Sequence, residues 1–142
     1  MNPLAAFRTR AARKPQITRV LIVDDEPLYA EAISVLLGAS DGIEVVGIAE
    51  DGQAGIDQAV ALQPDLVLMD VQMPRLDGIS ATRRLRHRLP RTKVLVMTAL
   101  TGDEYQEQAL SAGADAFVRK FSHGGDLITT IEQIAGAASL AA

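Results

Sequence analysis

Five polar side chains of this 142-residue chain each follow an apolar segment, and their types suit the transfer of a phosphoryl group. Three of them are carboxylates, one is a hydroxyl and one is an ammonium group. They are Asp24, Asp25, Asp70, Thr98 and Lys120. Three carboxylates held together repel one another, so a cation must neutralise them or one of them must be protonated.

The donor types predict both the cation and the reaction. Oxygen ligands without a neighbouring histidine or cysteine select a hard divalent ion, Mg²⁺ before Ca²⁺. The ammonium of Lys120 and the hydroxyl of Thr98 suit the oxygens of a phosphoryl group, whose charge must be stabilised during transfer. Asp70 would be the nucleophile and form an aspartyl phosphate. Each residue alone could be a turn or helix-start residue, but their joint occurrence at strand ends favours chemistry.

Five short apolar runs alternate with segments of helical periodicity and would bring these side chains to one edge of a sheet. The expected strands are 19–23, 44–49, 66–69, 94–97 and 116–118. Strict alternation predicts a parallel sheet covered by helices on both sides, and five units are too few for an eight-stranded barrel. The sequence therefore predicts a flavodoxin-like (βα)5 doubly wound α/β fold with strand order 2-1-3-4-5.

The first helix is expected to begin at Pro27 and to end at Gly38, since proline suits a first turn and glycine a helix end. Its apolar residues recur at helical spacing. They are Leu28, Ala32, Val35 and Leu36.

Composition and charge predict one ordinary globular domain, with 48% hydrophobic and 23% charged residues. We expect a flexible basic N-terminal extension over residues 1–16, the folded domain over 17–138 and the start of a linker or tail over 139–142. The first 19 residues carry five basic residues and no acid, so the remainder is acidic. An acidic body argues against nucleic-acid binding by this domain itself.

The absence of cysteine excludes disulfides and thiolate chemistry. No apolar run approaches the roughly 20 residues that span a bilayer, and the N-terminus lacks the apolar core of a signal peptide. A cytoplasmic location without a membrane partner is the expectation.

Four stretches of the chain together resemble the receiver domain of two-component response regulators. They are 23–26 (Val-Asp-Asp-Glu), 68–78 (with Met73-Pro74 and Asp77-Gly78), 97–99 (Met-Thr-Ala) and 113–120 (ending in Arg-Lys). The resemblance covers about residues 18–138. Phe121 in place of a proline, together with the ending at 134–140, is most similar to the NarL/FixJ (LuxR-type) subfamily. With phenylalanine after Lys120, whether the bond between these two residues is cis stays open.

The resemblance implies that a sensor histidine kinase supplies the phosphoryl group and that Asp70 accepts it with Mg²⁺. The implied ligands of the ion are Asp24 (through water), Asp25, Asp70 and the backbone carbonyl of Gln72. Thr98 and Lys120 would hold the phosphoryl oxygens. Beyond this transfer and the later dephosphorylation, the resemblance implies no enzymatic activity.

The resemblance also implies a switch and a docking surface. The hydroxyl of Thr98 would move inward, and the aromatic ring that matches the switch position, Phe117, would rotate behind it. Kinase docking is implied at Tyr29, Ala32 and Phe121. Phosphorylation would then favour a homodimer or the binding of an output domain. Control of transcription would require a DNA-binding helix-turn-helix domain that this sequence does not contain, so we expect a truncated chain.

Three alternatives remain open from the sequence. A stand-alone receiver would act through protein–protein interaction, and a pseudo-receiver would be a scaffold without phosphorylation. A phosphatase of the haloacid-dehalogenase type needs a second aspartate two residues after the nucleophile, where this chain has Gln72.

Overall fold

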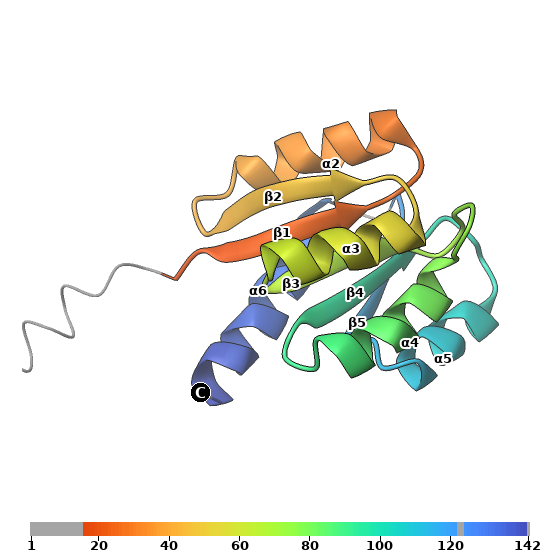
Figure 1. Ribbon diagram of the computed structural model, residues 1–142. Coiled ribbons are helices and arrows are strands. Elements are labelled where there is room, and N and C mark those ends of the chain that lie inside the picture. Colours follow the sequence, from red (N-terminus) through yellow and green to blue (C-terminus); the bar gives the residue numbers. More distant parts are fainter. Residues whose placement is uncertain (1–15, 122–123, 142) are drawn as a thin grey trace, which may run out of the picture.

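The computed structural model describes residues 16–121 and 124–141, and Figure 1 shows one sheet with helices on both faces. The five strands are parallel and lie in the order β2-β1-β3-β4-β5. They are β1 (Thr18–Val23), β2 (Ile43–Ala49), β3 (Leu66–Asp70), β4 (Lys93–Thr98) and β5 (Ala116–Arg119). The predicted fold class and strand order are confirmed.

Five helices follow the strands and divide between the two faces of the sheet (Figure 1). They are α2 (Pro27–Gly38), α3 (Gly52–Leu62), α4 (Gly78–Arg88), α5 (Asp103–Ser111) and α6 (Gly124–Ala141). One core cluster joins the sheet to α3, α4 and α5, and a second joins it to α2 and α6. Every residue of β3 is buried, which explains why the central strands are continuously apolar rather than alternating.

Helix α2 presents a different face to the core from the one its apolar periodicity indicated. Leu28 is 83% exposed and Val35 is 71% exposed, whereas Ala30, Ile33 and Leu37 are buried against the sheet. Nearly every position of this helix is apolar, so the sequence pattern does not define a single inward face. An apolar stripe is therefore left on the surface of the described part of the molecule.

The ends of the chain bear on the predicted domain boundaries. Residues 1–15 and 142 lie outside the described residues, and with them most of the predicted basic extension. Helix α6 continues to Ala141, so the backbone of residues 139–141, predicted as the start of a linker, is helical. No helix in the described ranges is long and apolar enough to cross a membrane.

Gly113 should resist substitution because its backbone has φ of +106°, a conformation that favours glycine. A Cβ at this position would also lie 2.3 Å from Cγ of Arg86, a half-buried side chain that is ion-paired to Asp115. We expect Gly113→Ala to lower the free energy of unfolding by about 1–2 kcal/mol, measured by urea denaturation.

The matched control for this change is Gly136→Ala on α6, where an added Cβ meets no atom within 4 Å. Alanine is the better helix former, so this variant should be more stable by about 0.5–1 kcal/mol. Equal effects of the two substitutions would contradict the conformational explanation.

Candidate functional site

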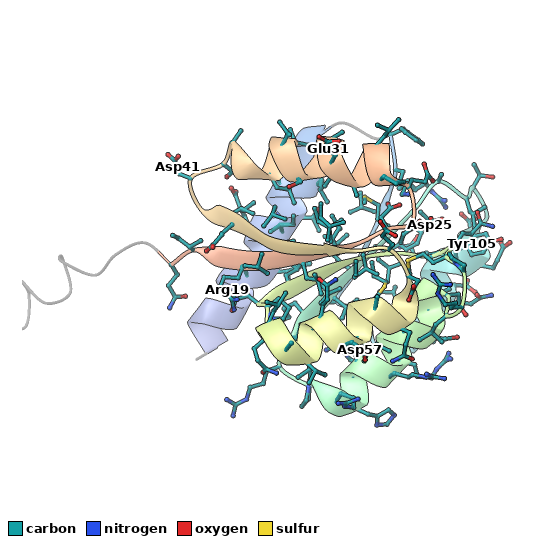
Figure 2. All side chains as sticks on the ribbon, turned by 45° about the horizontal axis from the view of Figure 1, so that its top comes forward. Arg19, Asp25, Glu31, Asp41, Asp57 and Tyr105 are labelled. Atoms are coloured by element: carbon teal, nitrogen blue, oxygen red, sulfur yellow. The ribbon has the colours of Figure 1, made fainter. Side chains whose placement is uncertain are left out.

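The carboxyl ends of β1 and β3 bring four acidic side chains together. Asp24 and Asp70 are 2% and 4% exposed, while Asp25 and Glu26 are open to solvent. One carboxylate oxygen from each of the four lies within 4.8 Å of the others. Figure 2 shows Asp25 at this end of the sheet, far from Arg19, which lies near the start of β1. The predicted convergence of the three aspartates is therefore present.

Lys120 follows β5 and extends its side chain into this acidic group. Its Nζ lies 2.8 Å from Oδ2 of Asp24 and 3.3 Å from Oδ2 of Asp70. Glu26 is more distant, with 3.6 Å between its Oε1 and the same ammonium. The lysine side chain is 1% exposed, so its charge is compensated inside the protein rather than by water.

One ammonium does not neutralise this group of acids. Burial and the neighbouring Asp24 carboxylate raise the pKa of Asp70 to about 7, although Lys120 acts in the opposite direction. Burial alone would lower the pKa of Lys120, but its contacts with Asp24 and Asp70 outweigh burial and raise it. The lysine therefore stays protonated at neutral pH, and a buried negative charge is left over that favours either a proton or a cation.

An oxygen-only group of this kind fits a hard divalent cation. Two of the four carboxylates are buried and two are exposed, which leaves room for the water molecules that Mg²⁺ retains when it binds proteins. Asp24, Asp25 and Asp70 are thus placed where they could hold the ion, and Glu26 extends the set. Glu26 belongs to the 23–26 stretch that carries the resemblance, but no ligand role was predicted for it, and its position beside two aspartates was the available signal.

Thr98 and Phe117 lie on the neighbouring strands β4 and β5 and differ in burial. Thr98 is buried at the end of β4, one residue after Met97, which pairs in register with Asp70. Its Oγ1 accepts a hydrogen bond of 3.0 Å from the amide of Leu100. Phe117 is half-buried against the core, and the guanidinium of Arg119 lies 5.5 Å from its ring centroid. The predicted switch pair thus lies on adjacent strands.

The loop after β3 carries Gln72 and is fixed at both ends. The amide of Gly78 donates a hydrogen bond of 2.8 Å to the carbonyl of Val71, and Asp77 caps α4 through the amides of Ile79 and Ser80. Gly78 is buried so closely that an added Cβ would lie 1.7 Å from the carbonyl oxygen of Asp70. The backbone of this loop is therefore held next to the acidic group.

A salt bridge that sequence reasoning missed crosses from this loop to the start of α3. Nε of Arg75 lies 2.9 Å from Oδ2 of Asp51, whose other oxygen caps α3 through the amide of Ala54. The Ala54 amide and Arg75 lower the pKa of the Asp51 carboxyl. This pairing could not be predicted, because a contact with a residue of another loop has no local sequence signal.

The three predicted docking residues lie on α2 and just after β5. Ala32 is exposed, Tyr29 is half-buried and Phe121 is 79% exposed. Phe121 has φ of +65°, and no peptide bond in the described segments is cis, including the one between Lys120 and Phe121. The bond left open by the sequence is thus trans.

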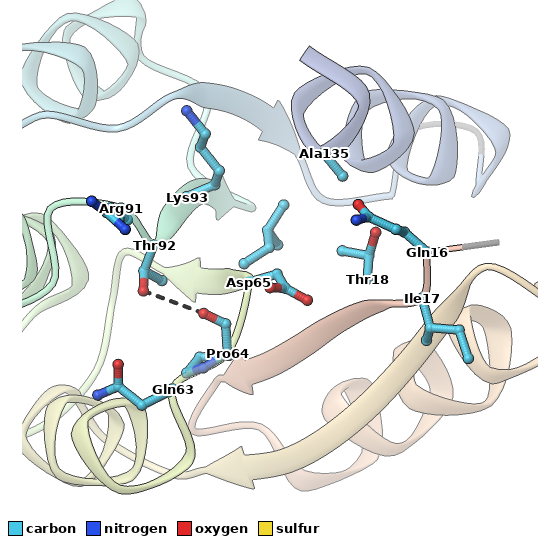
Figure 3. Close-up of a pocket in the computed structure, with 11 residues that line it drawn as sticks. Gln16, Ile17, Thr18, Gln63, Pro64, Asp65, Arg91, Thr92, Lys93 and Ala135 are labelled. Carbon is cyan, nitrogen blue, oxygen red and sulfur yellow. Dashed lines mark hydrogen bonds between the residues drawn. The ribbon is translucent and has the colours of Figure 1, made fainter. Parts of the chain in front are cut away.

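A cavity of about 570 Å³ lies at the opposite edge of the sheet, near the amino ends of β1, β3 and β4 (Figure 3). Its lining includes Thr18, Asp65 and Lys93, and the hydroxyl of Thr92 donates to the carbonyl of Pro64 at 3.3 Å. None of the five residues singled out from the sequence lines it. The candidate site is therefore the acidic group rather than this cavity.

The comparison with protein families decides what kind of domain this is. The model of the response regulator receiver domain matches residues 20–132, which include every residue of the acidic group and Lys120. The chain belongs to the response regulator receiver domain family. The fold and the strand-end side chains of this receiver domain agree with that assignment.

Relatives of the receiver domain carry different names. It is 46% identical over 104 residues to a protein-glutamate methylesterase/protein-glutamine glutaminase of Geobacter sulfurreducens, covering 72% of this chain and 28% of the relative. It is 37% identical to the response regulator GacA of Pseudomonas viridiflava, covering 82% of this chain and 54% of that protein. The chain thus spans about a quarter to a half of these relatives.

One solved receiver structure is similar to this chain over nearly all of its own length. The signal receiver domain of the NarL response regulator from Mycobacterium tuberculosis superposes with a TM-score of 0.82 and 33% identity, covering 86% of this chain and 98% of that one. The comparisons therefore establish the receiver domain without assigning it to the NarL/FixJ subfamily.

Proposed function

We propose that this receiver domain accepts a phosphoryl group on Asp70 from a sensor histidine kinase. The observation that carries the proposal is the burial of Asp70 beside Asp24 and the Lys120 ammonium at the carboxyl edge of the sheet. The new bond joins an Asp70 carboxylate oxygen to phosphorus while the bond from phosphorus to the kinase histidine nitrogen breaks. The domain catalyses only its own phosphorylation and dephosphorylation.

The residues of the site have separate roles in this proposal. Asp24, Asp25, Asp70 and the backbone carbonyl of Gln72 would hold Mg²⁺, which supplies charge neutralisation to the phosphoryl oxygens when bound. Lys120 is fixed by its ion pairs and donates to a phosphoryl oxygen, as does the hydroxyl of Thr98. Lys120 is in place before the reaction, whereas the hydroxyl of Thr98 has to turn towards the phosphoryl group.

The output switch is proposed to involve Thr98 and Phe117. When Thr98 turns its hydroxyl from the Leu100 amide towards the phosphoryl group, it vacates space beside β5. Phe117, which is only half-buried, can rotate into that space. A phenylalanine has no hydroxyl to fix either orientation, so packing alone sets the balance between the two states.

The kinase is proposed to dock on the apolar stripe of α2 and on Phe121. Leu28 and Val35 on α2 and Phe121 after β5 are exposed hydrophobic side chains, and Phe121 contacts the α2 residue Tyr29. Ala32 lies between the first two on the same helix face and allows close approach of a partner helix. Exposed apolar side chains on one helix face are typical of a protein interaction surface.

We infer that the phosphorylated domain forms a homodimer in the cytoplasm and controls transcription through a DNA-binding output domain of the NarL/FixJ type. The support for this candidate is the similarity to two proteins named as response regulators, GacA and NarL. Control of a methylesterase is the second candidate, favoured by the 46% identity to the Geobacter sulfurreducens relative. Phosphorylation of Asp70 would control either output in the same way.

Intact-mass measurement after incubation with acetyl phosphate tests the proposal. The wild type should gain one phosphoryl adduct that requires Mg²⁺, and Asp70→Asn should gain none. The matched control is Asp57→Asn, which changes an exposed carboxylate on α3 in the same way (Figure 2). An adduct on folded Asp70→Asn, or none on the wild type, would refute Asp70 as the acceptor.

A further inference from the structure

The aromatic ring of Tyr29 lies directly against the ammonium of Lys120. The Nζ atom of Lys120 is 4.3 Å from the ring centroid, within the range of a cation–π interaction. Such contacts are strongest where the cation is shielded from water, and the lysine side chain is 1% exposed. Tyr29 on α2 therefore interacts directly with the lysine of the acidic group.

Two further contacts fix the orientation of the Tyr29 ring. Its hydroxyl donates to Sδ of Met97 on β4 at 3.4 Å. Its ring meets the ring of Phe121 edge to face, with centroids 5.6 Å apart and an angle of 73° between the planes. Because Phe121 is 79% exposed, a continuous line of contacts runs from the surface through Tyr29 to Lys120.

We propose that Tyr29 is a positioning residue that holds the Lys120 ammonium for phosphoryl transfer and links it to the exposed ring of Phe121. This inference rests on the proposed function of Asp70. Tyr29 was predicted from the sequence only as a docking residue, and its contact with the lysine comes from the tertiary structure.

The physical need for this contact follows from the other partners of Lys120. Its ion pairs with Asp24 and Asp70 weaken whenever those carboxylates share their charge with another cation. The attraction to the aromatic ring does not depend on the charge of the carboxylates. The ring therefore keeps the ammonium beside Asp70 in the state in which the phosphoryl group must be received.

The same contacts predict how a docked partner acts on the site. An apolar helix of a kinase that covers Phe121 restricts the motion of that ring and, through the edge-to-face contact, the motion of Tyr29. Lys120 is then more firmly placed in the complex than in the free domain. The interaction surface and the phosphoryl-binding lysine are coupled through one side chain.

Substitutions at position 29 test the inference by the rate of adduct formation from acetyl phosphate with Mg²⁺. Tyr29→Leu should lower the maximal rate about tenfold, with the acetyl phosphate concentration at half-maximal rate and the Mg²⁺ affinity from calorimetry changed less than about twofold. Tyr29→Phe keeps the ring face and should stay within about twofold of the wild type. Urea denaturation of each variant checks that it is folded.

Fluorinated phenylalanines at position 29 separate the electrostatic role from a packing role. Successive ring fluorines withdraw electron density from the ring face with little change in shape, so the maximal rate should fall stepwise with their number. Unchanged rates for the fluorinated series, or for folded Tyr29→Leu, would overturn the inference while leaving phosphorylation of Asp70 intact. A wild type that forms no adduct would instead overturn the proposed function.

Discussion

Asp70→Asn should make the cation-free protein more stable than the wild type at neutral and alkaline pH. Burial and Asp24 raise the pKa of Asp70 to about 7 in the folded state, against a value of 3.8 for an unperturbed aspartate. Asparagine has nearly the same shape and carries no charge. The substitution therefore removes an unfavourable buried charge while Lys120 keeps its shorter contact with Asp24.

The sign of the pH dependence follows from proton binding. Between pH 4 and pH 7 the folded wild type retains a proton on Asp70 that the unfolded chain has released, so its stability falls as the pH rises through this window. Above the folded-state pKa, Asp70 is ionised in both the folded and the unfolded state, so its contribution to stability no longer changes with pH. The advantage of Asp70→Asn should grow from near zero at the acidic end to about 2–4 kcal/mol above pH 7.

Urea denaturation in the presence of a metal chelator, at several pH values between 4 and 8, measures the difference in free energy of unfolding between Asp70→Asn and the wild type. Asp41→Asn, which changes an exposed acid in the turn before β2, is the matched control and should alter stability by less than about 0.5 kcal/mol at any pH. Added Mg²⁺ should stabilise the wild type more than Asp70→Asn, because the variant lacks one carboxylate. A pH-independent difference would show that no excess charge is buried at Asp70.

Gly78→Ala should lower the free energy of unfolding by about 3 kcal/mol or more. An added Cβ would lie 1.7 Å from the carbonyl oxygen of Asp70 and 3.0 Å from Cγ of Met69. Relief requires a shift of backbone at the end of β3 or at the start of α4, and both are buried. Backbone displacement at close-packed positions is among the costly effects of point substitutions.

The same substitution should also weaken Mg²⁺ binding, because the displaced backbone belongs to the acceptor residue and to the loop of Gln72. Calorimetric titration with Mg²⁺ measures the affinity, and urea denaturation measures stability. Gly38→Ala is the matched control, since an added Cβ there meets nothing within 4 Å. Wild-type stability and affinity in Gly78→Ala would show that the end of β3 is free to move.

The strand-end residues of the site could be predicted because a parallel sheet converts sequence position into spatial position. The strands β1, β3 and β4 contain continuous apolar runs, and the last residue of each strand must lie at the same edge as the last residue of its neighbour. Asp24, Asp70 and Lys120 were therefore brought together by topology alone. The distances of 2.8 Å and 3.3 Å that make them one electrostatic unit required the structure.

Helix α2 shows where periodicity fails. Its apolar residues surround the axis, so the sequence fits several inward faces, and the sheet selects Ala30, Ile33 and Leu37. That selection depends on the tilt of the helix against β1 and β2, which is a property of packing and not of the helix itself. The exposed Leu28 and Val35 are its consequence.

By itself the sequence determined the fold, the strand order and the edge at which chemistry collects, because these depend on short-range patterns and on the few topologies that patterns allow. Only the tertiary structure decided the contacts between side chains of different loops and helices. The Arg75–Asp51 salt bridge and the Tyr29 ring over Lys120 are examples. Such contacts depend on side-chain directions across the sheet edge, and no local sequence pattern encodes them.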